Sequence, residues 1–270
     1  MTTIWIDFFP LWLLFILTVA MVLLSVEVGR FAALRFRNRS VKPAEGPVGA
    51  VIGSTLGLLA FLLAFTFSIA ATRFDTRRQE LLSEVIAIRT CHLRSGLIPA
   101  RQKELVRNLL KEYVHHRLEL ANQPSRLSEQ MPGFLKISAE LHAKLWKEAE
   151  HYAEKDPNSE ICTLFVDSIN SVINAHTRRL VIARYRIPGS IWIALYVVSI
   201  VSMTAVGYHF GLSGYWDLFV NVFLALTYAI VILLIADLDN PSAGYLYVSH
   251  QPVFELEQEL IKDSLAPGKP

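Results

Sequence analysis

The chain has 270 residues, 53% of them hydrophobic, and a mean hydropathy of +0.37. This apolar content exceeds what a water-soluble fold of this length needs for its core, so part of the surface must face lipid. The formal net charge is only +2, and no basic patch points to a nucleic-acid partner. Cys91 and Cys162 lack the spacing of a metal site or a disulfide framework. We therefore expect no cofactor and no bound metal.

Four uncharged stretches follow one another in two pairs, at residues 8–26, 46–72, 187–216 and 218–236. Even the shortest covers about 28 Å as a helix, close to the hydrocarbon thickness of about 30 Å. The first is preceded by MTTIWID, without the basic residues of a signal peptide, so we expect it to be retained. The sequence predicts four transmembrane helices.

Residues 73–186 are amphipathic, with apolar residues at helical spacing such as Leu141, Leu145 and Ala149. Proline-containing segments near 99, 122–133 and 157 divide this stretch into four helices, and we expect the outer two to continue spans two and three. The prediction is an all-α integral membrane protein, with two N-terminal and two C-terminal transmembrane helices flanking a helical water-facing domain. The segments are 1–72, 73–186, 187–236 and a C-terminal segment, 237–270.

Basic residues beside the spans give conflicting signals for orientation. The positive-inside rule places the middle domain in the cytoplasm because of the arginines on its flanks, namely Arg73, Arg77, Arg78, Arg178, Arg179, Arg184 and Arg186. The same rule applies to the connection between the first two spans, which holds Arg30, Arg35, Arg37, Arg39 and Lys42. We base the orientation on the arginines that flank the middle domain, because they are the more numerous. The sequence therefore predicts a multi-pass protein of the cell inner (plasma) membrane, with the termini and the helical domain in the cytoplasm.

The second span carries glycines at a four-residue step, Gly49, Gly53 and Gly57. Such small-xxx-small series let helix backbones approach closely in lipid. The sequence leaves open whether the partner helix belongs to the same subunit or to another one.

The same four-residue step continues through Phe61, Phe65, Ile69 and Arg73. A straight helix drifts by about 40° per step, so only neighbouring members share a surface. If several subunits set this span around an axis, the two phenylalanines would form an apolar constriction and Arg73 would concentrate anions. The ordinary alternatives are lipid-facing or packed phenylalanines and an arginine that reaches the headgroups. Considered alone, the residues favour these alternatives.

The segment RFDTRRQELLSE places Arg73, Arg77 and Glu84 close to one helix face, with Asp75 and Arg78 offset. Exposed pairs at such spacing contribute only about 0.2–0.5 kcal/mol each, so stability alone barely explains the cluster. A contact with another subunit or with the membrane surface is plausible.

Two acids, Asp237 and Asp239, directly precede an Asn-Pro pair after the fourth span. They are weak candidates for binding a cation. Calcium takes about six or more oxygens, however, so a helix end with solvated acids is the more ordinary account.

Enzyme chemistry finds no support in the sequence. No zinc-protease, nucleophile-elbow, phosphate-loop or dinucleotide motif occurs, and the adjacent His115 and His116 point in different directions on a helix. We assign no catalytic residue and expect a protein that is not an enzyme.

Several motifs together resemble the bestrophin-like domain family of bacterial and plant membrane proteins. They are LLAFLLAFTFSIAATRFDTRRQELLSEVIAIRT followed by LRSGLIP, then SINSVINAHTRR, DLDNP and VSHQP. The resemblance covers residues 50–254. The chain departs from the family pattern at Arg89, Cys91 and His92, and at 240–244, which weakens any transfer of a ligand site from the last of these segments.

The resemblance implies the plan of bestrophins, which are pentameric anion channels with a cytoplasmic helical domain between spans two and three. By that analogy Phe61 and Phe65 line a neck, and Asp237 and Asp239 lie near a carboxylate cluster similar to a calcium clasp. Our first hypothesis is a homo-oligomeric, anion-conducting channel lined by the second span. The alternative is a non-conducting membrane scaffold or sensor whose helical domain binds a soluble partner.

Overall fold

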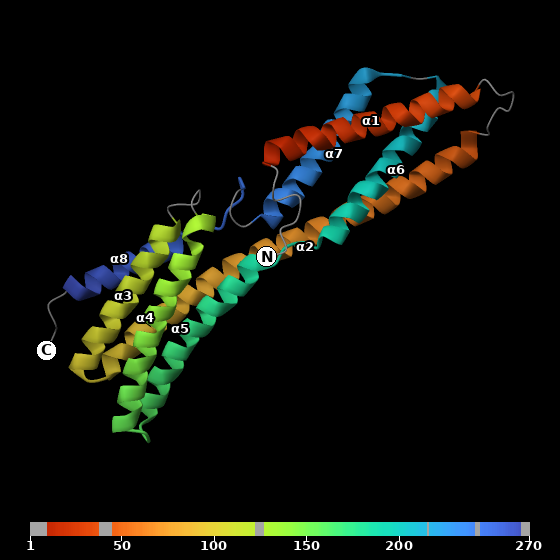
Figure 1. Ribbon diagram of the computed structural model, residues 1–270. Coiled ribbons are helices and arrows are strands. Elements are labelled where there is room, and N and C mark those ends of the chain that lie inside the picture. Colours follow the sequence, from red (N-terminus) through yellow and green to blue (C-terminus); the bar gives the residue numbers. More distant parts are fainter. Residues whose placement is uncertain (1–9, 38–44, 122–126, 215, 241–243, 266–270) are drawn as a thin grey trace. The chain divides into compact units, whose positions relative to one another are not determined.

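The computed structural model describes residues 10–37, 45–121, 127–214, 216–240 and 244–265, and all regular structure in these ranges is helical. Figure 1 labels the helices, which are α1 (Leu11–Arg37), α2 (Glu45–Arg94), η2 (Ser95–Leu97), α3 (Ala100–Ala121), α4 (Leu127–Lys155), α5 (Glu160–Arg184), α6 (Gly189–Ser213), α7 (Leu218–Asp239) and α8 (Gln251–Leu265). The predicted all-α class is confirmed.

Four of the described helices, α1, α2, α6 and α7, are long and apolar enough to cross a membrane. Hydrocarbon offers no hydrogen bonds to the backbone, and a helix satisfies its own N–H and C=O groups. The four predicted spans are confirmed. Helix α1 extends to Arg37, so Arg30 and Arg35 belong to this helix and not to a connecting loop. The predicted start at residue 8, together with Arg39 and Lys42, lies outside the described residues.

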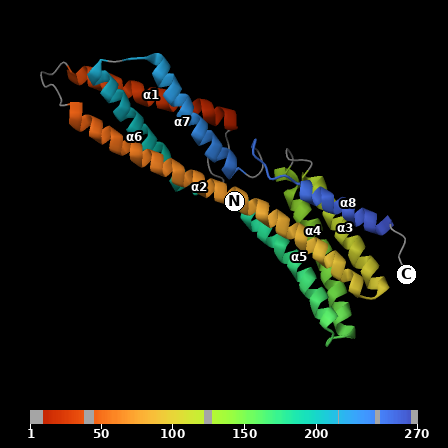
Figure 2. The same ribbon diagram turned by 180° about the vertical axis from the view of Figure 1, so that it is seen from behind.

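The helices form two compact units. The membrane unit contains α1, α6, α7 and the part of α2 up to Phe74. The second unit, which we call the water-facing unit, contains α2 from Asp75 onward, η2, α3, α4, α5 and α8. Within the membrane unit α1 packs along both α6 and α7 (Figures 1 and 2).

Glycines bring α1 and α6 into backbone contact. A Cβ atom at Gly207 would lie 1.9 Å from the carbonyl oxygen of Val26, and one at Gly29 would lie 1.9 Å from that of Thr204. Gly211 approaches Ala33 in the same way. Lipid supplies no hydrophobic drive for helix association, so close contacts of this kind hold the helices together. The series packed within the subunit is therefore GYHFG at 207–211, which the sequence analysis missed.

Helix α2 runs without a break through 50 residues, as predicted. At 1.5 Å per residue it is about 75 Å long, more than twice the thickness of the hydrocarbon layer. Its charged half beyond Arg73 therefore lies outside the hydrocarbon.

The predicted continuity between the middle domain and the third span is wrong. Helix α5 ends at Arg184 and α6 begins at Gly189. Pro188 has no N–H group to donate, and it disfavours the helical conformation at the residue before it. The backbone N–H of Ile187 is bonded instead to the Asp239 carboxylate at 3.0 Å.

The water-facing unit buries one continuous apolar core. Its members come from α2, α3, α4, α5 and α8 and include Leu81, Val85, Ile88, Val106, Leu110, Leu141, Leu145, Phe165, Ile169, Val172 and Leu256. Ion pairs join the last helix to its neighbours at its rim, with Arg89 2.7 Å from Glu259 and Arg107 2.6 Å from Asp263.

The variant Gly207→Ala tests the contact between α1 and α6. The added methyl group overlaps the Val26 carbonyl oxygen, so the helices must separate. We expect a loss of about 1–3 kcal/mol of stability, seen as a lower Tm of the detergent-solubilised protein. The control, Gly133→Ala, adds the same methyl group where no atom lies within 4 Å. Equal Tm values for the two variants would contradict the close contact.

Candidate functional site

The predicted pore residues Phe61 and Phe65 lie together on the outside of α2. Their side chains are 66% and 55% exposed, and their rings stack with centroids 6.4 Å apart. Because residues four apart share a helix face, this is the expected consequence of their spacing. The exposed line continues through Ser68, three residues after Phe65, and then through Thr72, four residues further on.

Ile69 and Arg73, the other two predicted pore residues, leave this exposed line. Ile69 is half-buried and packs against the core of the membrane unit. Arg73 is also half-buried, and its Nη1 atom has no hydrogen-bond partner in the part of the chain that the structure describes. The drift of a straight helix against a four-residue step accounts for the separation. Ser68 and Thr72, which the sequence analysis did not select, follow from the same helical period.

The three glycines of α2 are exposed. A Cβ atom added at Gly49, Gly53 or Gly57 would find no atom within 4 Å. Near them a groove of about 490 Å³ lies between α1, α2 and α6, and its apolar lining includes Val51, Ile52 and Val201. Close packing within the subunit is thus absent at these glycines.

The charges of the RFDTRRQELLSE motif have different environments. Asp75 and Arg78 are exposed, whereas Arg77 and Glu84 are buried. Only 2% of Glu84 is exposed, although it is a carboxylate. Buried carboxylates need partners, and its partners define the most elaborate polar site of the water-facing unit.

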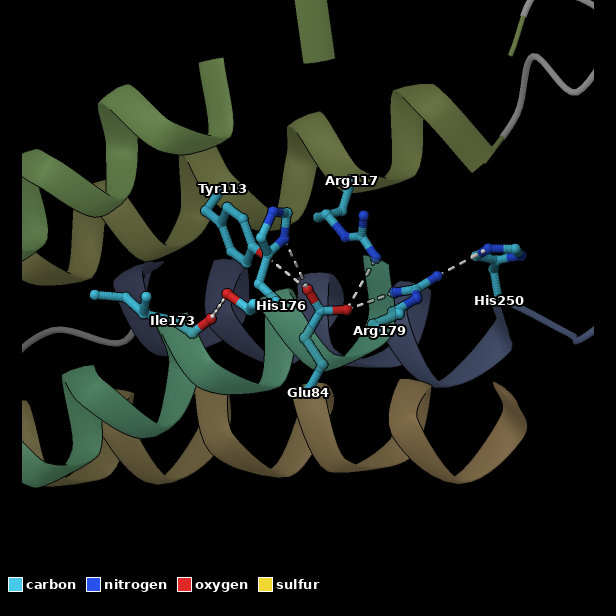
Figure 3. A network of polar contacts seen from close by, with 8 residues as sticks. Glu84, Tyr113, Arg117, Ile173, His176, Arg179 and His250 are labelled. Atoms are coloured by element: carbon cyan, nitrogen blue, oxygen red, sulfur yellow. Dashed lines mark hydrogen bonds and ion pairs between the residues drawn. The ribbon is translucent and has the colours of Figure 1, made fainter. Parts of the chain in front are cut away.

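Figure 3 shows the donors that surround Glu84, which we call the Glu84 network. One carboxylate oxygen accepts the hydroxyl of Tyr113 at 2.5 Å and lies 3.7 Å from Nδ1 of His176. The other accepts Nη2 of Arg117 at 2.9 Å and Nη1 of Arg179 at 2.5 Å.

Two further contacts extend the Glu84 network. The Tyr113 hydroxyl lies 2.8 Å from Nδ1 of His176, and Nη2 of Arg179 lies 3.3 Å from Nε2 of His250. Helices α2, α3 and α5 and the residue that precedes α8 are therefore joined through one carboxylate.

The charges of the network shift the pKa values of its members. Burial would raise the pKa of Glu84, but Arg117, the contact with His176, Arg179 and Tyr113 together hold that pKa well below its ordinary value. Burial, and then the positive charge of Arg179, lowers the pKa of His250 to about 4. Burial, and then the neighbouring His176, lowers the pKa of His142 to about 4. Glu84 is thus ionised and both of these histidines are neutral at pH 7.

The Glu84 network brings together residues from motifs that lie far apart in the sequence. Glu84 belongs to the first motif, His176 and Arg179 to SINSVINAHTRR, and His250 to VSHQP. Tyr113 and Arg117 were missed. The sequence pattern that could have identified them is an arginine in line with apolar residues: Val106, Leu110, Tyr113 and Arg117 follow one another at helical spacing, and all four are buried.

The two acids after the fourth span bind backbone groups. Asp237 accepts the N–H groups of Tyr245 and Leu246 at 2.8 and 3.1 Å. Asp239 accepts the N–H of Ile187, and Arg186 donates to its carbonyl oxygen at 2.7 Å. Among the described residues no group of three or more His, Cys, Asp or Glu side chains is placed to bind a metal ion. These acids connect chain segments within the membrane unit.

Residues 12–253 match the Bestrophin-like domain. The chain belongs to the Bestrophin-like domain family. Crystal structures of two mutants of a bacterial bestrophin homologue from Klebsiella pneumoniae resemble this Bestrophin-like protein. One has a TM-score of 0.67 at 16% identity, covering 93% of this chain and 99% of that one. The other has a TM-score of 0.64 at 17% identity, covering 92% and 98%.

At this level of identity the structural likeness shows the fold alone. A comparison with curated proteins finds no significant match. Together, the family and the four apolar helices establish a Bestrophin-like, multi-pass membrane protein.

Replacing Glu84 by Gln leaves the buried guanidinium group of Arg117 and the half-buried one of Arg179 without their carboxylate. We expect the free energy of unfolding to fall by about 3–5 kcal/mol, measured by chemical denaturation in detergent. The control is Glu80→Gln, one turn earlier, whose partner Arg178 is 55% exposed. Such a surface pair contributes at most about 1 kcal/mol. Similar losses in both variants would contradict a special role for Glu84.

Acid should destabilise the water-facing unit in two stages. Between the ordinary histidine pKa of about 6.5 and the value of about 4 for His142 and His250, the unfolded chain binds more protons. Stability is therefore lost as the pH falls through this window. The depressed pKa of Glu84 adds a further loss below about pH 4.

The slope of Tm between pH 7 and pH 4.5 measures the first stage of this acid effect. We expect His142→Gln to reduce the slope, because one of the two histidines is then missing. His151→Gln, at an exposed position, should leave the slope unchanged. An unaltered slope in His142→Gln would remove His142 from this explanation.

Proposed function

We propose that the protein is a homo-oligomeric channel that conducts anions through a pore lined by α2. The observation that carries this proposal is the burial of the apolar spans. Only 11% of the apolar window in α2 is buried within the subunit, against 28–33% in the other three. Helix α2 thus has the largest face free for contact with further subunits or with a pore.

The glycines of α2 support contact between subunits. No atom of the residues that the structure describes lies within 4 Å of a Cβ atom at Gly49, Gly53 or Gly57. Small residues on an exposed face let the backbone of another helix approach closely in lipid. A second copy of the chain is the partner we assign to this face. The number of copies is five by analogy with bestrophins.

The stacked rings of Phe61 and Phe65 supply the constriction. Repeated around an axis, they form an apolar neck that gates ions by dewetting. Arg73, three turns from Phe61, is half-buried beside this line and not on it; in the oligomer we assign it one positive charge per subunit near the cytoplasmic end, which favours anions. The arginines on the flanks of the middle segment favour a cytoplasmic water-facing unit in the cell inner membrane.

Ion flux into liposomes tests the constriction. Phe61→Ala combined with Phe65→Ala should raise anion flux several-fold, because the apolar neck is widened. The matched control is Phe219→Ala with Phe223→Ala, which removes a second exposed stacked pair on α7, with ring centroids 6.5 Å apart. Equal changes from both pairs would place Phe61 and Phe65 in lipid. An oligomeric wild-type protein without flux would favour the non-conducting scaffold or sensor.

The same liposomes test selectivity. Arg73→Glu reverses one charge per subunit, so the preference for anions over cations should weaken or invert. Arg78→Glu, at an exposed position of the water-facing unit, is the control. Unchanged selectivity in Arg73→Glu would remove Arg73 from the conduction pathway.

A further inference from the structure

Within the part of the chain that the structure describes, four polar side-chain atoms between α3 and α4 are buried without a hydrogen-bond partner. They are Nε2 of His116, Nε of Arg117, Oγ of Ser138 and Nε2 of His142. Ser138 is 0% exposed, Arg117 8% and His142 9%. An unpaired buried polar group is destabilising, and such groups are rare in folded proteins. Four of them in one region call for a common explanation.

Ring contacts show that the four atoms share one region. The rings of Tyr113 and His142 lie 5.0 Å apart, and those of His116 and Phe134 lie 4.8 Å apart. Helices α3 and α4 are therefore antiparallel, and Ser138 lies on α4 one turn from each of its partners in these pairs. The guanidinium carbon of Arg117 lies 5.2 Å from the Phe134 ring. The four residues thus lie on or against the two turns of α4 between Phe134 and His142.

The four atoms are mainly hydrogen-bond donors, and this determines which charge a ligand at this position would carry. The Nε atom of Arg117 can only donate, and the Ser138 hydroxyl donates freely. Each imidazole donates in the tautomer that carries its proton on Nε2. A cation would face at least one fixed donor and the guanidinium charge. An acceptor with negative charge suits Arg117, Ser138 and each imidazole in that tautomer, while Nδ1 of His116 also lies 3.7 Å from the Glu119 carboxylate.

The charge balance of the surroundings points the same way. Arg117 and Arg179 both bind Glu84, which is the one buried carboxylate among the described residues of the water-facing unit. Two guanidinium groups against one carboxylate leave a surplus positive charge, which is buried at Arg117 and partly exposed at Arg179. Buried charge is expensive unless it is compensated. The neighbouring His142 and His250 avoid adding to the surplus because burial lowers the pKa of each to about 4.

We propose that these groups form a binding site for a monatomic, monovalent anion of the halide class. Arg117, Ser138, His116 and His142 supply the donors, and the surplus charge beside Glu84 supplies the attraction. A single-atom ligand suits a position between two directly packed helices. The site belongs to the water-facing unit and does not depend on conduction through α2, so its failure would leave the proposed channel untouched.

Thermal unfolding of the full-length protein in detergent tests the site. After dialysis into gluconate, bromide replaces gluconate at constant ionic strength. The Tm should rise and saturate with bromide, because a ligand that binds the folded state stabilises it by mass action. No rise, or a rise without saturation, overturns the proposal.

A pair of matched variants locates the effect. Ser138→Ala should lose most of the bromide-dependent rise, while in gluconate it should be at least as stable as the wild type, since it removes an unpaired polar group. Ser168→Ala is the control, because Ser168 is equally buried but its hydroxyl already donates to the Phe165 carbonyl at 2.6 Å. It should keep the full rise. A rise that persists in Ser138→Ala places the bromide elsewhere and overturns the proposal.

Crystals grown in bromide give an independent answer. An anomalous difference peak within hydrogen-bonding distance of Arg117 Nε and Ser138 Oγ is expected. Density at that position without an anomalous signal identifies a water molecule and overturns the assignment of an anion, as does the absence of any density.

Discussion

Helix α2 passes from hydrocarbon into water without a break, and the two solvents impose different kinds of packing along it. In lipid, apolar side chains gain little by leaving the solvent, so the membrane unit depends on close backbone contacts and on hydrogen bonds between spans. The glycine contacts of α1 with α6 and the bond of 3.1 Å between Thr18 and Tyr196 are of this kind. In water, apolar burial is itself the main stabilising term. Beyond Arg73 the same helix accordingly contributes to a continuous apolar core.

The Glu84 network gives that core a definite register. Apolar side chains of similar size tolerate repacking, whereas a buried carboxylate is satisfied only where its donors arrive at the right positions. Replacing a whole buried ion network by apolar groups is often neutral, but losing one partner is strongly destabilising. We infer that the Glu84 network selects one arrangement of α2, α3 and α5 more than it adds stability. This selection accounts for the convergence of motifs that are far apart in the sequence.

The sequence predicted the features that depend on solvent preference alone. The four spans and the unbroken α2 follow from where charges begin and end along the chain. Features that depend on which segments of the chain meet in space were harder to predict from the sequence. Two small-xxx-small series are present, and composition does not distinguish GYHFG, which packs within the subunit, from the glycines of α2, which do not. Tyr113 and Arg117 lie 29 and 33 residues from Glu84, so their meeting depends on how α3 folds back. The break before α6 was within reach, since Pro188 marks it.

Exposed phenylalanines alone do not distinguish a pore-lining helix from a lipid-facing one. Among the described residues of the membrane unit, two stacked phenylalanine pairs are exposed, one on α2 and one on α7. Both would suit lipid. Their helices differ in the residues around them, because α2 exposes Gly53 and Gly57 beside large side chains such as Leu58, whereas α7 exposes Ile230 and Leu234 and contains no glycine. Large branched side chains fill the space beside lipid chains, but small ones leave room for another helix backbone. The low burial of α2 and the small side chains on its exposed face, and not the phenylalanines themselves, favour α2 as the helix that meets its copies around an axis.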